Sequence, residues 1–282
     1  MRTNLLLVEG LPGSGKSTTA NLLYDLLKAN ACNVELFTEG NLDHPADYDG
    51  VSVFTKDEFE QLLLETENEK LRKAFVNQAW AKGKEIFLPY RKIQSEAGLP
   101  DDLLSVIFKK DIYELPFDRN VELIADRWAA FSEKALSEQK IYIFECCFIQ
   151  NPLTIGMVKY GEPKEKVVQY VNRLTAAIER LNPVLFYVDQ LDISYSFKKA
   201  VKERPAEWSA GFIDYYTNQG YGKMHQLHGL EGTLQVLEAR REIEREIFAS
   251  LPFGKVLLDN STFDKEKHKS NLSDKLTAFG IL

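Results

Sequence analysis

The sequence predicts an α/β protein, a three-layer sandwich in which a five-stranded parallel sheet lies between two layers of helices. Five short strand-like runs, of which the first is typical of a buried parallel strand, alternate along the chain with stretches of helical period. The chain has 282 residues, of which 44% are hydrophobic and 27% charged, which supports a large core and excludes wholesale disorder. Because no internal repeat or linker divides the chain, we expect a single domain over 1–282.

The apolar runs give the strands in chain order. The five expected strands are Leu5–Val8, Asn33–Phe37, Ile141–Phe144, Val184–Val188 and Lys255–Leu258. A helix follows the first strand from Lys16, because leucines recur there on one helical face. Further helices are expected over 164–181, 231–249 and 265–279.

Two long segments interrupt this alternation. From Thr55 to Ala135 the period is mainly helical, and the segment is too long for a simple crossover between strands. We therefore expect a helical insertion over 56–135. A second excursion, over 192–229, is rich in Lys, Tyr and Gly, and we expect it to be mobile and lid-like.

Charge and cysteine content limit the partners and the compartment. The chain has 35 Lys and Arg residues against 42 Asp and Glu residues, so its net charge is −7. Nucleic-acid coats and polybasic membrane binders neutralise phosphate or anionic lipid, so we expect neither nucleic acid nor membrane as a partner. Cys32, Cys146 and Cys147 cannot form an even disulfide framework, and we find no secretory leader and no apolar run of about 18 residues. These features predict reduced thiols and a cytoplasmic location.

A phosphate-binding motif follows the first expected strand. The pattern is Gly, four residues, Gly, Lys and Ser, placed between a strand and a helix as a phosphate loop requires. Its glycines let backbone N–H groups turn toward phosphate oxygens, its lysine brings a cation to the β- and γ-phosphates, and its serine can ligate Mg²⁺. We expect the nucleotide to bind at Gly10, Leu11, Pro12, Gly13, Ser14, Gly15, Lys16, Ser17 and Thr18.

Acidic residues stand at the ends of three expected strands. Glu39 follows the second strand, Glu145 the third and Asp189 the fourth. Ligands of open parallel sheets lie at the carboxyl ends of the strands, so these acids are candidates for the site. Glu145 resembles a Walker B acid that holds Mg²⁺, with a strand-terminal acid bound to a helix N-terminus as the alternative. Asp189 is better explained by a structural cap or an ion pair.

The stretch from Val8 to Thr18 resembles the opening of the P-loop kinases, in particular the thymidylate and deoxynucleoside kinase branch. The order of strands, the helical insertion and the late basic excursion match that branch in outline. The motif itself is shared by all P-loop NTPases, so it indicates nucleotide binding more than a particular chemistry. The resemblance implies the P-loop NTPase fold, ATP and Mg²⁺ as cofactors, and phosphoryl transfer to an unidentified small-molecule acceptor, with nucleosides and nucleotides among the candidates.

The resemblance also implies roles for individual residues. Lys16 would steady the γ-phosphate, Ser17 and Glu145 would hold Mg²⁺, and Glu39 would take the proton of the acceptor hydroxyl. The alternative for Glu39 is a solvated loop acid. Lys202 and Arg204 would bring positive charge to the nucleotide from the lid, and their alternative is a solvated helix face.

One departure from that family concerns the acceptor. Deoxynucleoside kinases carry an Arg directly after the third-strand acid, and thymidylate kinases have an Asp-Arg pair there, whereas this chain has Cys146 and Cys147. We therefore expect a divergent acceptor. The insertion, which would lie on the substrate side, supplies groups that could stack on a ring or bind an anionic tail, namely Tyr90, Arg91, Lys92, Arg119, Arg127 and Trp128.

Two other functions share the same motif. A P-loop NTPase or switch acting on a protein partner is one, although the chain has no guanine-reading Asn-Lys-x-Asp element. A nucleotide-binding protein without transfer activity is the other. The oligomeric state, a homodimer included, stays open.

Overall fold

The computed structural model describes residues 3–282, and within it the chain forms two compact units. The first unit joins the residues up to Glu39 to Trp128–Leu282, and the second is Gly40–Arg127. The second unit interrupts the chain of the first and so corresponds to the expected insertion. Its bounds are 40–127, whereas 56–135 was predicted: it already includes the strand at 52–55, and the helix over 117–136 continues into the first unit.

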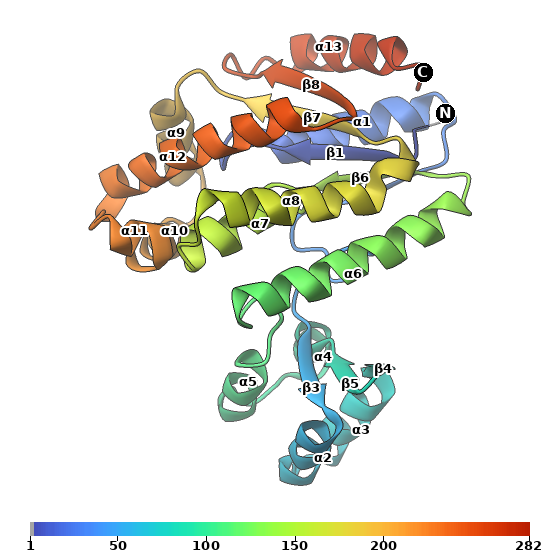
Figure 1. Ribbon diagram of the computed structural model, residues 1–282, viewed down its shortest axis with the longest axis vertical. Helices are drawn as coiled ribbons and strands as arrows, with labels where there is room; N and C mark the ends of the chain where they lie inside the picture. Colours follow the sequence, from blue (N-terminus) through green and yellow to red (C-terminus); the bar gives the residue numbers. More distant parts are fainter. Residues whose placement is uncertain (1–2) are drawn as a thin grey trace. The chain divides into compact units, whose positions relative to one another are not determined.

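The first unit contains the predicted five-stranded parallel sheet, in the order β2-β6-β1-β7-β8 (Figure 1). Its strands are β1 (Leu5–Glu9), β2 (Val34–Phe37), β6 (Ile141–Glu145), β7 (Val184–Asp189) and β8 (Gly254–Asp259). Each end lies within one residue of its predicted position. The fold class is therefore confirmed.

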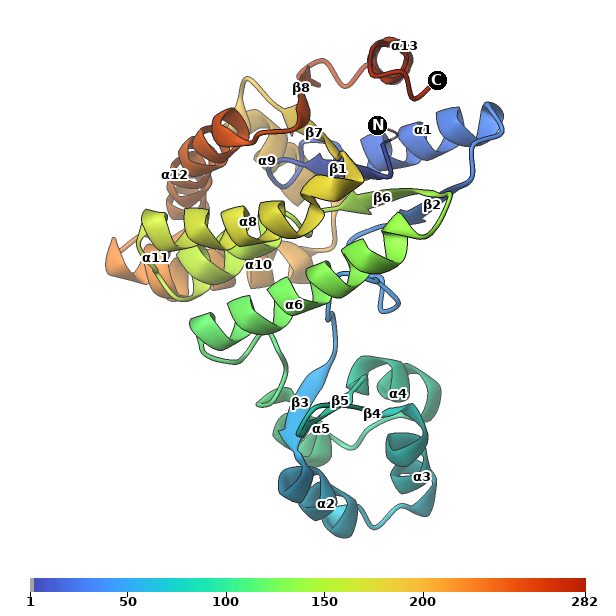
Figure 2. The same ribbon diagram turned by 45° about the vertical axis from the view of Figure 1, so that its right-hand side comes forward.

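Helices cover both faces of this sheet, as Figures 1 and 2 show. On one face, α1 (Lys16–Ala29) and α13 (Lys265–Ala278) pack their leucines on alternate strand residues such as Val8, Ile143 and Phe186. On the other face lie α8 (Lys164–Ile178), α12 (Gly229–Ser250) and the end of α6 (Phe117–Leu136). Burial on both faces explains why the central strands β1, β6 and β7 are apolar runs, whereas the edge strands β2 and β8 are partly exposed.

The remaining helices of the first unit follow β6 and β7. They are α7 (Gln150–Leu153), the π-helix η1 (Thr154–Lys159), the 3₁₀ turn η2 (Glu179–Leu181), α9 (Ile193–Glu203), α10 (Ala206–Asn218) and α11 (Gly220–Met224). The excursion over 192–229 is thus mostly helical. Within residues 3–282, no helix combines the length and the apolar character needed to cross a membrane.

The second unit has a small sheet that helical periodicity did not predict. An antiparallel sheet in the order β3-β5-β4 has two helices between its first two strands in sequence and two helices after its last strand. The elements are β3 (Ser52–Thr55), α2 (Lys56–Glu65), α3 (Glu69–Gln78), β4 (Trp80–Lys82), β5 (Glu85–Leu88), α4 (Tyr90–Ala97) and α5 (Asp101–Phe108). Strands of three or four residues are too short to show an alternating pattern.

Candidate functional site

The predicted phosphate-binding motif forms a loop between β1 and α1. Gly10, Gly13 and Gly15 have φ values of 144°, 83° and 100°, in the region that favours glycine. A Cβ atom on Gly10 would lie 2.3 Å from the carbonyl oxygen of Val188. All three positions therefore favour glycine for their backbone conformation, and Gly10 is also required by the close approach of the loop to β7.

Two amides that sequence reasoning missed support this loop. The carbonyl oxygen of Ser14 accepts hydrogen bonds from Gln190 Nε2 at 3.1 Å and from Asn260 Nδ2 at 2.8 Å. Both amides directly follow a strand of the sheet, Gln190 after β7 and Asn260 after β8. Ligands of open parallel sheets lie at the carboxyl ends of the strands, and this rule, which identified the strand-end acids, could have identified Gln190 and Asn260 as well.

Lys16 lies at the start of α1 and is 7% exposed. Its Nζ donates to the carbonyl oxygen of Leu11 at 3.0 Å, which holds the ammonium inside the loop. Burial alone would lower the pKa of Lys16, but nearby negative groups, Glu39 and Glu145 among them, outweigh it and raise that pKa. The ammonium therefore remains charged where phosphate oxygens would bind.

The predicted Mg²⁺ ligands lie side by side. Ser17 Oγ donates to Glu145 Oε1 at 2.5 Å, and the backbone N–H of Glu39 donates to Glu145 Oε2 at 3.3 Å. The nearest ligand atoms of Glu39, Glu145 and Cys146 lie within 4.8 Å of one another. The oxygen atoms of the carboxylates and of the serine suit Mg²⁺, which prefers such ligands, whereas the Cys146 sulfur does not.

Cys146, where the resembled kinases have Arg, is buried and has a φ of 72°. Burial raises the pKa of its thiol well above the ordinary value, so the thiol stays neutral. The left-handed backbone at this residue turns the chain from β6 toward α7. The missing arginine is therefore replaced by a neutral side chain at the turn.

A glutamine connects Glu39 to the interior of the site. Gln150 Nε2 donates to Glu39 Oε1 at 2.8 Å, while its backbone N–H donates to Glu9 Oε2 at 2.9 Å. The N–H of Phe148 donates to the other oxygen of Glu9 at 2.7 Å. Burial raises the pKa of Glu9 to about 7. Gln150 thus fixes one oxygen of the exposed Glu39 carboxylate.

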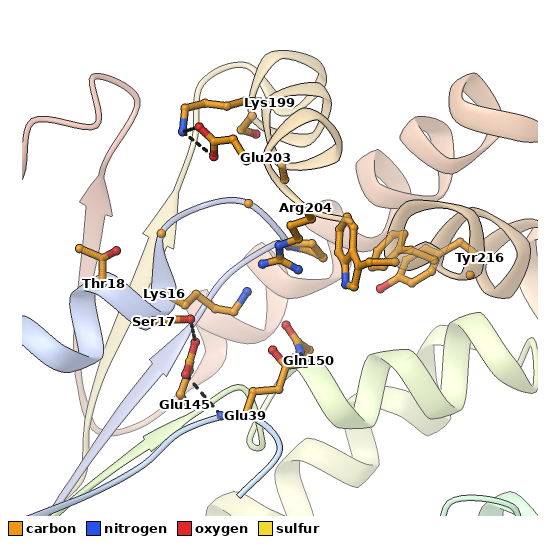
Figure 3. Close-up of a pocket in the computed structure, with 18 of the residues that line it drawn as sticks. Lys16, Ser17, Thr18, Glu39, Glu145, Gln150, Lys199, Glu203, Arg204 and Tyr216 are labelled. Carbon is orange, nitrogen blue, oxygen red and sulfur yellow. Dashed lines mark hydrogen bonds and ion pairs between the residues drawn. The ribbon is translucent and has the colours of Figure 1, made fainter. Parts of the chain in front are cut away.

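These groups open into a cavity of about 640 Å³ in the first unit (Figure 3). One side of the cavity is the phosphate loop with Ser17, Glu39 and Glu145. The facing side carries aromatic rings of α10, and these are Trp208, Phe212, Tyr215 and Tyr216. The size and the mixture of aromatic and polar groups are typical of a small-molecule site.

The excursion brings Arg204, but not Lys202, to this cavity. Arg204 lines it, with its guanidinium stacked 4.2 Å from the Trp208 ring centroid, and in Figure 3 it extends toward Lys16. Lys199 lines the cavity as well and pairs with Glu203 at 2.9 Å. Lys202 lines a different cavity on α9, because it projects from another face of that helix.

The other residues singled out from the sequence lie elsewhere. Asp189 forms an ion pair with Arg245 at 2.7 Å, as the structural interpretation predicted. In the second unit, Lys92 and Arg127 line a cavity of about 480 Å³ together with Trp80. Arg91 and Arg119 form ion pairs within the second unit, Tyr90 donates to Asp111, and Trp128 is buried in the first unit.

Comparison with known proteins gives a likeness at the level of structure. No protein-family model and no curated protein matches the sequence. Among solved structures, the chain is similar to thymidylate kinase from Candida albicans, with 12% identical residues and a TM-score of 0.44. The similarity covers 99% of this chain and 93% of that chain. At this level of similarity, function is inferred from the residues of the site.

Proposed function

We propose that the protein is a kinase that transfers a phosphoryl group from Mg²⁺-ATP to a small-molecule acceptor, a nucleoside or a nucleotide. One observation supports this most directly. A single cavity holds the phosphate loop, the Ser17 and Glu145 oxygens that could bind Mg²⁺, and the partly free carboxylate of Glu39, and rings of α10 line its other side. A hydrolase needs the first two features, whereas a wall of aromatic rings suits a second, ring-bearing ligand.

The phosphate loop would hold the triphosphate through its backbone N–H groups and the N-terminus of α1. Lys16 and Arg204 would place positive charge on the transferring group, where negative charge spreads over the phosphoryl oxygens. Ser17 and Glu145 would hold Mg²⁺, which neutralises charge on the β- and γ-phosphates. Each of these groups lines the same cavity.

Glu39 would accept the proton of the acceptor hydroxyl. One of its oxygens is held by Gln150, so the other remains for the acceptor. Positioned general bases contribute roughly 10²- to 10⁴-fold to rate. A carboxylate that is fixed by an amide and exposed to the cavity suits this role.

The experiment is a transfer assay with ATP, Mg²⁺ and a panel of nucleosides and nucleoside monophosphates, in which ³¹P NMR separates phosphorylated product from free phosphate. We expect transfer to at least one acceptor and a loss of about 10²-fold or more in Glu39→Gln. Glu242→Gln is the matched control, because this exposed glutamate of α12 does not line the cavity. Release of phosphate with no transfer to any acceptor would contradict the proposal.

A further inference from the structure

A buried guanidinium lies behind the aromatic side of the cavity. Arg240, in α12, is fully shielded from solvent, and its Nε donates to Glu244 Oε1 at 2.5 Å. The other oxygen of Glu244 accepts from the Tyr187 hydroxyl at 2.6 Å. Removing an ion pair from water carries a penalty that can exceed its attraction, so stability is a weak reason to bury one. The other contacts of Arg240 point to its role.

Arg240 binds two hydroxyl groups that line the cavity. Its Nη1 donates to the Tyr216 hydroxyl at 2.7 Å and to Thr154 Oγ1 at 3.1 Å. Tyr216 belongs to α10, and Thr154 is the first residue of the π-helix η1. Single π-helical turns are rare and occur often at functional sites. One guanidinium nitrogen thus fixes two cavity-lining side chains that come from separate elements.

The chemistry of these groups determines the direction of each hydrogen bond. A guanidinium has only donors, so both hydroxyl oxygens must accept from it. Each hydroxyl still has a proton to donate, and neither has another hydrogen-bond partner within residues 3–282. Both residues line the cavity, so a ligand there can accept both protons. Tyr216 and Thr154 therefore form a pair of donors without an acceptor.

The charge balance and the neighbouring rings indicate which acceptor fits. The charge of Arg240 is already balanced by Glu244, so the two hydroxyls form a neutral pair of donors, which suits a neutral oxygen better than a further anion. The ring of Tyr216 stacks on that of Phe212, with centroids 4.0 Å apart and an interplanar angle of 16°. Trp208 lies 5.2 Å beyond Phe212. A planar ring can lie against this wall with its oxygen beside the hydroxyls.

We propose that Tyr216 and Thr154 bind a carbonyl oxygen on a planar ring of the acceptor, and that Arg240 is the positioning residue that aims both hydroxyls. The inference rests on the proposed function, because the ligand is the acceptor of phosphoryl transfer. It narrows the acceptor to compounds whose ring carries a carbonyl group. The facing positions of Tyr216 and Lys16 in Figure 3 place this contact across the cavity from the phosphate loop.

The test compares ligands that differ by one ring carbonyl, and it measures binding rather than turnover. Calorimetry with inosine against purine riboside, and with uridine against 2-pyrimidinone riboside, gives the affinity ratio of each pair. We expect the ligand with the additional carbonyl to bind about tenfold more tightly in the wild-type protein for at least one pair. Tyr216→Phe keeps the ring and removes the hydroxyl, so it lowers this ratio, and the double variant with Thr154→Val brings it to about one.

Tyr221→Phe, which removes a hydroxyl on α11 outside the cavity, leaves the ratio unchanged. Removing Arg240 would leave Glu244 as an unpaired buried charge and destabilise the fold. The test therefore uses Tyr216→Phe and the double variant with Thr154→Val instead of a variant of Arg240. Equal affinities within both pairs, or ratios unaltered in the double variant, overturn the inference. If no nucleoside binds while Mg²⁺-ATP does, the inference fails, yet phosphoryl transfer to another acceptor still stands.

Discussion

Glu9 shows how a single residue of β1 connects the stability of the fold to the geometry of the site. Its carboxyl group is buried and accepts the N–H groups of Phe148 and Gln150, and the side chain of Gln150 holds Glu39. Burial raises the pKa of Glu9 to about 7, so the folded state retains a proton that the unfolded chain loses near pH 4.5. Folding is therefore coupled to proton uptake between these two values.

The sign of this coupling gives a prediction for Glu9. Between pH 4.5 and 7 the folded state binds more protons than the unfolded state, so the free energy of unfolding falls as pH rises. Each unit of pH accounts for about 1.4 kcal/mol, so Glu9 lowers stability by about 2–3 kcal/mol between pH 5 and 8. Urea unfolding of the wild type and of Glu9→Gln across this range measures the effect: the free energy of unfolding of the wild type minus that of the variant should fall by that amount from pH 5 to pH 8.

Glu242→Gln controls for general effects of removing a carboxylate, because Glu242 is exposed on α12. Its pH dependence should parallel that of the wild type. A stability difference between the wild type and Glu9→Gln that stays constant from pH 5 to 8 would contradict a perturbed Glu9.

At the residue scale, the reactive residues of the site can be recognised from the sequence, whereas the residues that position them cannot. Lys16, Ser17 and the strand-end acids are recognisable because each chemical role demands one residue type at one position in a strand–loop–helix unit. Gln150 and Arg240 have no such signature. Their roles arise from contacts across more than 80 positions of sequence, such as Arg240 with Thr154, which only folding reveals.

At the scale of elements, the phosphate loop depends on backbone that glycine alone can adopt. Gly10 has a φ of 144°, and a Cβ atom there would lie 2.3 Å from a backbone oxygen of β7. Gly10→Ala should therefore lower the free energy of unfolding by about 2–4 kcal/mol and weaken nucleotide binding, because strain and overlap add. Chemical unfolding and nucleotide titration measure the two effects.

Gly280→Ala is the matched control for this substitution. Gly280 also has a positive φ, of 64°, but nothing lies within 4 Å of its Cβ position. It should cost about 1 kcal/mol from backbone strain alone and leave nucleotide binding unchanged. Equal losses of stability in the two variants would show that the close approach to β7 has no energetic effect.

Predictions of elements succeeded where a pattern extends over enough residues. The three central strands of the main sheet, β1, β6 and β7, were located because each is an apolar run buried on both faces. The excursion over 192–229 was expected to be mobile, since its glycines and Pro205 read as loop signals. Its helices pack through Trp208, Phe212 and Tyr216, whose spacing of four residues places them on one face of α10. This packing, which the local signals do not reveal, accounts for the helical structure of the excursion.

At the scale of the whole molecule, the chain has separate cores in its two units. Residues of the main sheet with α1 and α13 form one, and a cluster within 54–107 forms another. Units with separate cores need not unfold together.

The separate cores predict how heat unfolds the protein. We expect calorimetry to show two transitions, with Mg²⁺-ATP raising only the one that belongs to the first unit, because the phosphate loop lies there. Trp80 reports on the second unit, and Trp128 and Trp208 report on the first, so fluorescence of Trp80→Phe assigns the transitions. A single transition with coincident probes would show that the units unfold as one.

The most direct test of the proposed kinase is whether the phosphate loop binds a nucleotide and whether Lys16 contributes to that affinity. Isothermal calorimetry of Mg²⁺-ATP is compared between the wild type, Lys16→Ala and the matched control Lys28→Ala, whose lysine is exposed in the last turn of α1. We predict that the wild type and Lys28→Ala bind equally, and that Lys16→Ala binds at least about tenfold more weakly, as expected for losing a buried charged contact to phosphate. Equal binding by the wild type and Lys16→Ala, or binding by neither, would contradict the account.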